Sequence, residues 1–136
     1  MRQAKDLKYL GMGICTTKLA NRQITFKRMR RAKEAVGRIA WSKIPMRAKI
    51  RMIRSIVIPI ATYGAQMRTI ARNEAAPVNA EIDKMVWGKF RRHRCPEILR
   101  TMVLSPSDEP SLASIGCAIK AARRLIKKRP ERRRQI

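Results

Sequence analysis

Apolar residues recur along most of this chain with the spacing of helices. In the stretch that begins at Thr25, the residues Phe26, Met29, Val36 and either Ile39 or Ala40 follow one another at intervals of three, four or seven. Basic residues occupy the positions between them. This pattern predicts an amphipathic helix with one buried face and a basic back.

A second helix is predicted between Pro45, which suits a first turn, and Tyr63-Gly64, which suits a stop. Pro59 should kink or end this helix, because proline has no backbone N–H. The buried positions are expected to be Met46, Ile50, Ile53, Val57 and Ile60.

Two more helices are predicted before the clearest turn of the chain. The first should start after the cap candidate Asn73 and end near Trp87-Gly88, and the second should start at Pro96 and extend to about Leu104. The segment 105–110, with two prolines and two serines, is predicted to be a linker.

The last predicted helix begins at the cap candidate Ser111 and ends near Lys128, because Pro130 prevents its continuation. Its apolar row comprises Leu112, Ile115, Ile119, Ala122 and Ile126. At the other end of the chain, Leu7 to Cys15 is predicted to form one short strand.

These elements define a mainly α fold, a small domain of about four to five helices with one short N-terminal strand and basic extensions. We expect a helical domain in residues 1–104, a linker in residues 105–110 and a basic C-terminal helix and tail in residues 111–136. At 136 residues, the chain is long enough to bury one small core.

Charge then identifies the class of partner. The chain has 33 basic and 9 acidic residues and a net charge of +24. From Lys120 to Arg134, nine of fifteen residues are basic. Because such self-repulsion requires a polyanion to neutralise it, the composition predicts binding to nucleic acid.

The sequence offers little for metal, cofactor or catalytic chemistry. The 3 cysteines are far apart and form no C-x-x-C pair, and a metal site built around His93 and Cys95 would lack paired ligands. Neither a phosphate-binding glycine loop nor an apolar stretch long enough to cross a membrane is present. We therefore expect no enzyme activity, cofactor, metal, small-molecule substrate or membrane span.

Four segments resemble the carboxy-terminal half of a non-LTR retrotransposon reverse transcriptase. Lys8-Tyr9-Leu10-Gly11 is similar to the Tyr-Leu-Gly that closes the palm of that family, and Lys49 to Gly64 is similar to its thumb helix, which ends in Tyr-Gly. Trp87-Gly88-Lys89 and Arg94-Cys95-Pro96-Glu97 resemble a region that follows the thumb. The resemblance covers residues 8–104.

The catalytic palm of that family is missing. Its polymerase chemistry needs two metal-binding aspartates in one strand, whereas Asp6, Asp83 and Asp108 stand alone in this sequence. We interpret these acids as surface ion pairs. What the resemblance implies for this chain is the thumb's ability to hold a nucleic-acid duplex by its phosphates.

The candidate RNA-binding residues come from three basic stretches. His93 is interpreted as one more phosphate donor among arginines, and the segment after Pro130 as extended chain along RNA. The full set is Arg28, Arg30, Arg31, Lys89, Arg91, Arg92, His93, Arg94, Arg123, Arg124, Lys127, Lys128, Arg129, Arg132, Arg133 and Arg134.

Trp41 and Trp87 allow two interpretations, as hydrophobic plugs at helix ends or as platforms for unpaired bases. With 4% aromatic residues the chain lacks an interleaved basic and aromatic surface, so we favour plugs. Backbone contacts are then expected to dominate over base reading.

Our primary hypothesis is a domesticated thumb that serves as a structural RNA-binding protein of a large ribonucleoprotein. A mitochondrial ribosome is the favoured particle, with rRNA and neighbouring ribosomal proteins as partners and the mitochondrion as the compartment. The first alternative is a thumb fragment or subunit of a split reverse transcriptase. A third hypothesis, in which the last helix anchors to a membrane surface or an acidic partner, ranks below both because small Ala residues interrupt its apolar face.

Overall fold

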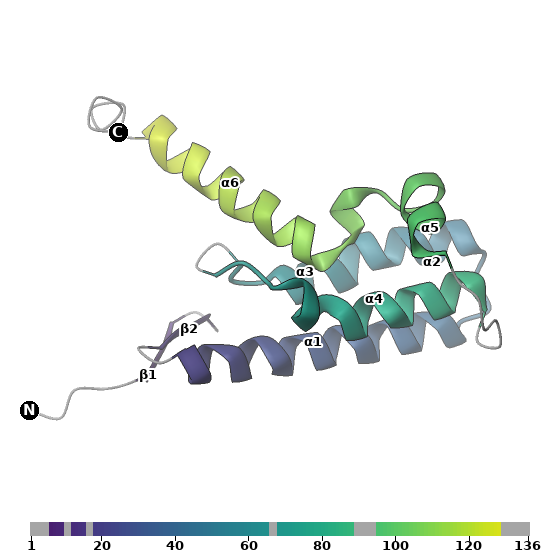
Figure 1. Ribbon diagram of the computed structural model, residues 1–136, viewed down its shortest axis with the longest axis horizontal. Coiled ribbons are helices and arrows are strands. Elements are labelled where there is room, and N and C mark those ends of the chain that lie inside the picture. Colours follow the sequence, from purple (N-terminus) through teal and green to yellow (C-terminus); the bar gives the residue numbers. More distant parts are fainter. Residues whose placement is uncertain (1–5, 10–11, 16–17, 66–67, 89–94, 129–136) are drawn as a thin grey trace, which may run out of the picture.

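The computed structural model of the chain describes residues 6–9, 12–15, 18–65, 68–88 and 95–128. Within these ranges the fold is a small, mainly helical domain, as the apolar spacing predicts. The longest helix, α1 (Lys18–Trp41), runs along one side of the molecule (Figure 1).

A short antiparallel hairpin precedes α1. The strands β1 (Asp6–Tyr9) and β2 (Met12–Cys15) pair with Leu7 opposite Ile14. The sequence pattern predicted a single strand over these residues. Two strands form instead, since an isolated strand would leave its backbone N–H and C=O groups without partners.

The second helical segment changes register along its length. The helices α2 (Met46–Met52) and α3 (Ile58–Thr62) are joined by a π-helical turn, Ile53–Val57, in which the backbone N–H of Ile58 donates to the carbonyl of Ile53. Pro59 follows this wider turn. The sequence predicts that Pro59 kinks or ends the helix; Pro59 does not end it, since the helical path is distorted into the π turn just before Pro59 and then continues to Thr62.

The end of this segment agrees with the prediction. Gly64 has a φ of 76°, a left-handed conformation that glycine adopts without strain, and it follows the last residues of α3. Gly88 has a φ of 93° and likewise ends α4 (Arg72–Trp87). Both predicted stops are confirmed.

The start of α4 differs from the prediction by two residues. Ala71 rather than Asn73 is the cap residue, and its backbone N–H donates to the Glu74 carboxylate over 3.2 Å. Glu74 thus satisfies one of the N–H groups that every helix leaves unpaired at its first turn. The Asn73 side chain accepts instead from the Glu74 N–H, at 2.9 Å.

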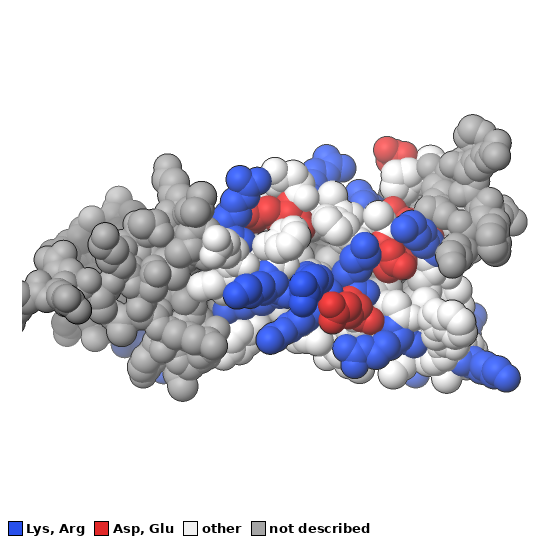
Figure 2. Space-filling model, turned by 90° about the horizontal axis from the view of Figure 1, so that it is seen from below, with Lys and Arg blue, Asp and Glu red and all other residues white. Residues whose placement is uncertain are grey.

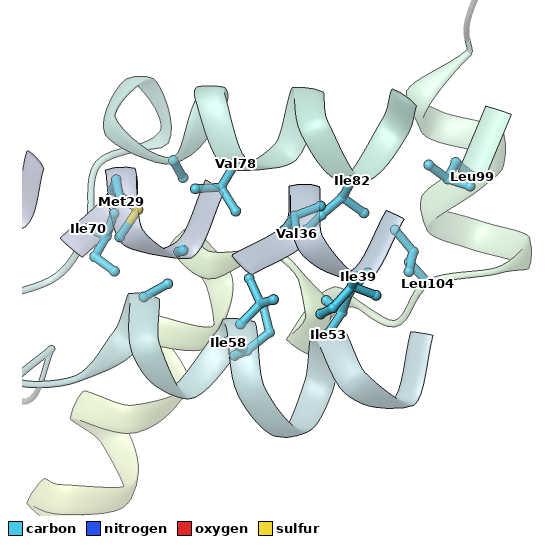
Figure 3. Packing of buried hydrophobic residues seen from close by; sticks show 14 residues of the cluster. Met29, Val36, Ile39, Ile53, Ile58, Ile70, Val78, Ile82, Leu99 and Leu104 are labelled. Atoms are coloured by element: carbon cyan, nitrogen blue, oxygen red, sulfur yellow. The ribbon is translucent and has the colours of Figure 1, made fainter. Parts of the chain in front are cut away.

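The hydrophobic core lies where α1, α4 and the α2–α3 segment meet (Figure 3). Figure 3 shows Val36 of α1 between Ile82 of α4 and Ile53 of the π turn. Burying each such side chain contributes about 1.5–3 kcal/mol relative to leaving it in water. The buried residues of this core cluster are Met29, Ala32, Val36, Ile39, Ile53, Val57, Ile58, Ala61, Ile70, Ala75, Val78, Ile82, Leu99 and Leu104.

The predicted buried stripe of α1 is right except at its first position. Phe26 is 68% exposed, while Met29, Val36 and Ile39 are buried and Ala32 completes their row. The row advances by three, four and three residues, and Phe26 lies roughly a quarter turn away from it. The spacing of apolar residues alone does not show that Ala32, and not Phe26, lies in the core.

The last part of the chain packs against the domain through small residues and not through its apolar row. The short helix α5 (Pro96–Met102) precedes a 3-10 turn, Pro106–Asp108, and α6 (Pro110–Lys128) then packs against α3 and α4. Ser111 and Ser114 are buried there, whereas the predicted apolar row, from Leu112 to Ile126, is exposed or half-exposed.

A hydrogen-bond chain explains why serines occupy this contact. The buried Ser114 hydroxyl accepts from the Ile70 N–H at 3.0 Å and donates to the Ser111 carbonyl at 2.6 Å. The buried Ser114 hydroxyl and Ile70 N–H therefore both have hydrogen-bond partners in this contact. Serine also allows α6 to approach the loop that leads into α4.

Candidate nucleic-acid interface

The first basic surface lies on α1. Its sequence contains eight Lys or Arg residues and a single acid, Glu34. Six of these cations are exposed: Arg22 near the start of the helix, and five farther along, which we call the α1 basic face, namely Lys27, Arg30, Arg31, Lys33 and Arg38. Figure 2 looks at the molecule from the α1 side and shows basic side chains spread across it, with acidic ones between some of them.

The second basic surface lies on α6, which contains five cations and no acid. All five are exposed, and we call them the α6 basic face: Lys120, Arg123, Arg124, Lys127 and Lys128. Figure 1 shows α1 and α6 on opposite sides of the helices between them. The two basic faces therefore do not form one continuous surface.

Arg28 does not belong to the α1 basic face, although the sequence made it a candidate. Its guanidinium Nη1 donates to the Tyr63 carbonyl, and its Cζ lies 5.3 Å from the centre of the Tyr63 ring. Burial lowers the pKa of Arg28 from its usual value. The structure thus uses Arg28 to hold α1 against the end of α3.

The acids are mostly committed to contacts that hold the domain together. Asp108 binds Arg54, Glu109 lies 3.7 Å from Arg100, and Glu74 lies 2.8 Å from Arg68. Among the candidate RNA-binding residues, Arg30 has an acidic partner, Glu34, at 3.4 Å. Both side chains of this pair are largely exposed, so it contributes little.

Five other candidates have no such partner among the described residues. Within the part of the chain that the structure describes, no carboxylate lies within 4.0 Å of Arg31, Arg123, Arg124, Lys127 or Lys128. The positive charge of both faces is therefore left for a ligand to neutralise. Phosphate groups are the ligands that best match several exposed guanidinium and ammonium groups along a helix.

The candidate RNA-binding set omits four members of these faces, although Lys27, Lys33 and Lys120 belong to the basic stretches that the sequence shows. Lys27, Lys33, Arg38 and Lys120 are exposed beside the candidates. The signal was present in the spacing, since Arg38 follows Arg31 by seven residues and Lys120 precedes Arg123 by three. Residues Lys89, Arg91, Arg92, His93, Arg94, Arg129, Arg132, Arg133 and Arg134 lie outside the described residues.

The two tryptophans occupy different environments. Trp87 packs against the core, and its buried Nε1 has no hydrogen-bond partner among the described residues. Trp41 is 90% exposed at the end of α1. The interpretation as a plug suits Trp87 and is wrong for Trp41.

The interpretation of Asp108 as a surface acid is also wrong. Its side chain is only 2% exposed, and it accepts from Arg54 and from the Ser105 N–H. A short 3-10 turn places this carboxylate inside the domain, where a cation and a backbone donor stabilise it.

Among the described residues, no three His, Cys, Asp or Glu side chains are grouped as a metal site would require. No helix within these ranges combines the length and apolar content needed to cross a membrane.

Comparisons of the chain with models of protein families, with curated proteins and with solved structures found no match. The relation to reverse transcriptases therefore stays a hypothesis based on the four segments quoted above.

Proposed function

We propose that this chain is a structural RNA-binding protein of a large ribonucleoprotein. The observation that carries the proposal is the pair of basic faces on α1 and α6, whose cations are largely without acidic partners. A backbone of phosphates neutralises such faces and releases its own counterions when it binds.

The position of the two faces favours a structural role. Because α1 and α6 lie on opposite sides of the helices between them (Figure 1), a chain with a basic face on each can contact two RNA segments at once and hold them at a fixed separation. Large ribonucleoproteins need such connections between segments of folded RNA. We propose rRNA as the partner, together with neighbouring ribosomal proteins.

A mitochondrial ribosome is the particle we propose. The segments that resemble a reverse transcriptase do not resemble a universal ribosomal protein, and organellar ribosomes include proteins of unusual origin.

Sedimentation tests the proposal. A tagged chain expressed in its own cells should co-sediment with a ribosomal subunit on a sucrose gradient and move to the top after ribonuclease treatment. Lys27→Ala with Arg31→Ala should weaken this association. The matched control is Arg47→Ala with Arg51→Ala, which removes two exposed charges at the same spacing from α2. A chain that sediments with membranes, or free of RNA, contradicts the proposal.

A second candidate function is the thumb of a split reverse transcriptase. It is favoured by the end of α3, where Tyr63 and the left-handed Gly64 stop the thumb-like helix. The same gradient decides between the two. Co-purification with a chain that bears paired catalytic aspartates supports the thumb, and co-purification with ribosomal proteins supports the structural role.

A further inference from the structure

Trp41 is the most exposed large hydrophobic side chain in the described part of the protein, at 90%. Burial of a tryptophan is strongly favourable, and its large flat ring usually contacts other atoms over most of its surface. Trp41 lacks those contacts, although it is the last residue of a helix whose opposite face is well packed. Its ring is therefore available to a ligand.

The surface next to Trp41 is open. Gly37 lies one turn earlier on the same side of α1, and a Cβ placed on it would meet no atom within 4 Å. Trp41, Gly37, Arg38 and Glu34 line a shallow depression of about 540 Å³. A glycine inside a helix costs about 1 kcal/mol relative to alanine, and the packing of α1 does not require one here.

The depression lies at the end of a row of cations. Lys27, Arg31 and Arg38 are separated by four and seven residues, and Trp41 follows Arg38 by three, so all four lie on one side of α1. The row spans about 21 Å at 1.5 Å per residue. Phosphate-binding cations beside an exposed aromatic ring are the combination with which proteins hold single-stranded nucleic acid.

We propose that Trp41 stacks on an unpaired RNA base, over the space left by Gly37, while the phosphates of the same strand lie along Lys27, Arg31 and Arg38. This inference rests on the proposed RNA binding and adds a preference for single-stranded segments. The Arg38 guanidinium is placed to bind the phosphate next to the stacked base. Stacking is tolerant of sequence, because every base presents a flat face.

The surroundings of Trp41 favour a base over a lipid surface or a protein groove. The depression is bordered by charged Glu34 and Arg38, whereas a helix that lies on a membrane presents a broad apolar face. A flat ring with charges at its edge matches a nucleotide, which has a flat base attached to a charged backbone.

The test uses the full-length chain carrying Trp87→Phe, so that Trp41 is its only tryptophan. Titration with a 12-nucleotide oligouridine should quench the fluorescence of Trp41, whereas an RNA duplex of equal charge should not. Trp41→Ala should weaken binding to the single strand by roughly tenfold and leave binding to the duplex unchanged. Trp41→Phe should retain most of the affinity.

Two controls locate the effect at the base. Gly37→Leu fills the depression without removing a charge and should weaken single-strand binding as Trp41→Ala does. On a strand of the same length without bases, Trp41→Ala and the parent chain should bind equally. Helical circular dichroism of both variants should match that of the parent chain, since neither residue is buried.

The results separate this inference from the proposed function. If Trp41→Ala binds the oligouridine as tightly as the parent chain does, the stacking inference is wrong even though RNA binding stands. If the parent chain binds neither RNA at 0.1 M salt, both are wrong. Quenching by a protein from the particle, with none by RNA, would assign Trp41 to a protein contact instead.

Discussion

Arg54 and Asp108, 54 residues apart in the chain, form a bidentate ion pair that connects the π turn to the segment before α6. The Arg54 Nε lies 2.8 Å from one carboxylate oxygen of Asp108, and Nη2 lies 2.7 Å from the other. The hydrogen bond to Asp108 raises the pKa of Arg54. Asp108 is buried and Arg54 is half-exposed. Removing Arg54 therefore leaves a buried charge without its partner, whereas neutralising Asp108 leaves a charge that water can solvate.

Removing Arg54 should destabilise the fold more than neutralising Asp108. Arg54→Met leaves a buried carboxylate whose remaining described donor is the Ser105 N–H, whereas Asp108→Asn leaves a guanidinium that water can reach. We expect a loss of about 3 kcal/mol for Arg54→Met and about 1–2 kcal/mol for Asp108→Asn. Urea unfolding of both variants measures the difference.

Glu81→Gln is the control for this comparison. It breaks the surface pair between Glu81 and Lys84, whose atoms are 3.4 Å apart, and should cost at most about 0.5 kcal/mol. If Arg54→Met is as mild as Glu81→Gln, the buried ion pair does not hold α6 in place.

A charged side chain in place of Ile53 should unfold the domain. Ile53 is fully buried in the π turn, so Ile53→Asp should cost more than about 4 kcal/mol and abolish helical circular dichroism at 25 °C. Arg51→Asp, two residues earlier and exposed, should leave the spectrum unchanged. Lys49 is a poorer control, because its Nζ donates to the Ala40 carbonyl at 2.8 Å.

Arg28 and Arg31 should separate stability from RNA binding. Arg28→Ala removes the contacts with Tyr63 and should lower the free energy of unfolding by about 1–2 kcal/mol. Arg31→Ala removes an exposed cation and should leave stability unchanged while weakening RNA binding. Thermal unfolding measures the stability of the two variants, and filter binding measures their affinity for RNA. If Arg31→Ala destabilised the fold and Arg28→Ala did not, our placement of Arg28 would be wrong.

The helices could be predicted from sequence because their signals are local. The spacing of Met29, Val36 and Ile39 identifies the buried side of α1, and the glycines after Tyr63 and Trp87 identify two helix ends. These features depend on a few adjacent residues and on backbone geometry.

The packing side of α6 and the role of Arg28 could not be predicted from the sequence, because both depend on tertiary contacts. The row from Leu112 to Ile126 is apolar, yet α6 packs through Ser111 and Ser114, where the Ser114 hydroxyl accepts from the Ile70 N–H in the loop before α4. Arg28 and Arg31 look alike in sequence, but only one of them lies next to Tyr63. Such differences depend on partners 35 or more residues away along the chain.

The salt dependence of RNA binding tests the central claim most directly. If the two basic faces contact about ten phosphates, log affinity should fall with log salt at a slope on the order of 7 to 9. Lys27→Ala with Arg31→Ala should reduce the slope by about 1.5 to 2, whereas Arg47→Ala with Arg51→Ala should not change it. A slope near 2 for the unaltered chain, or equal effects of the two double variants, would contradict RNA binding through these faces.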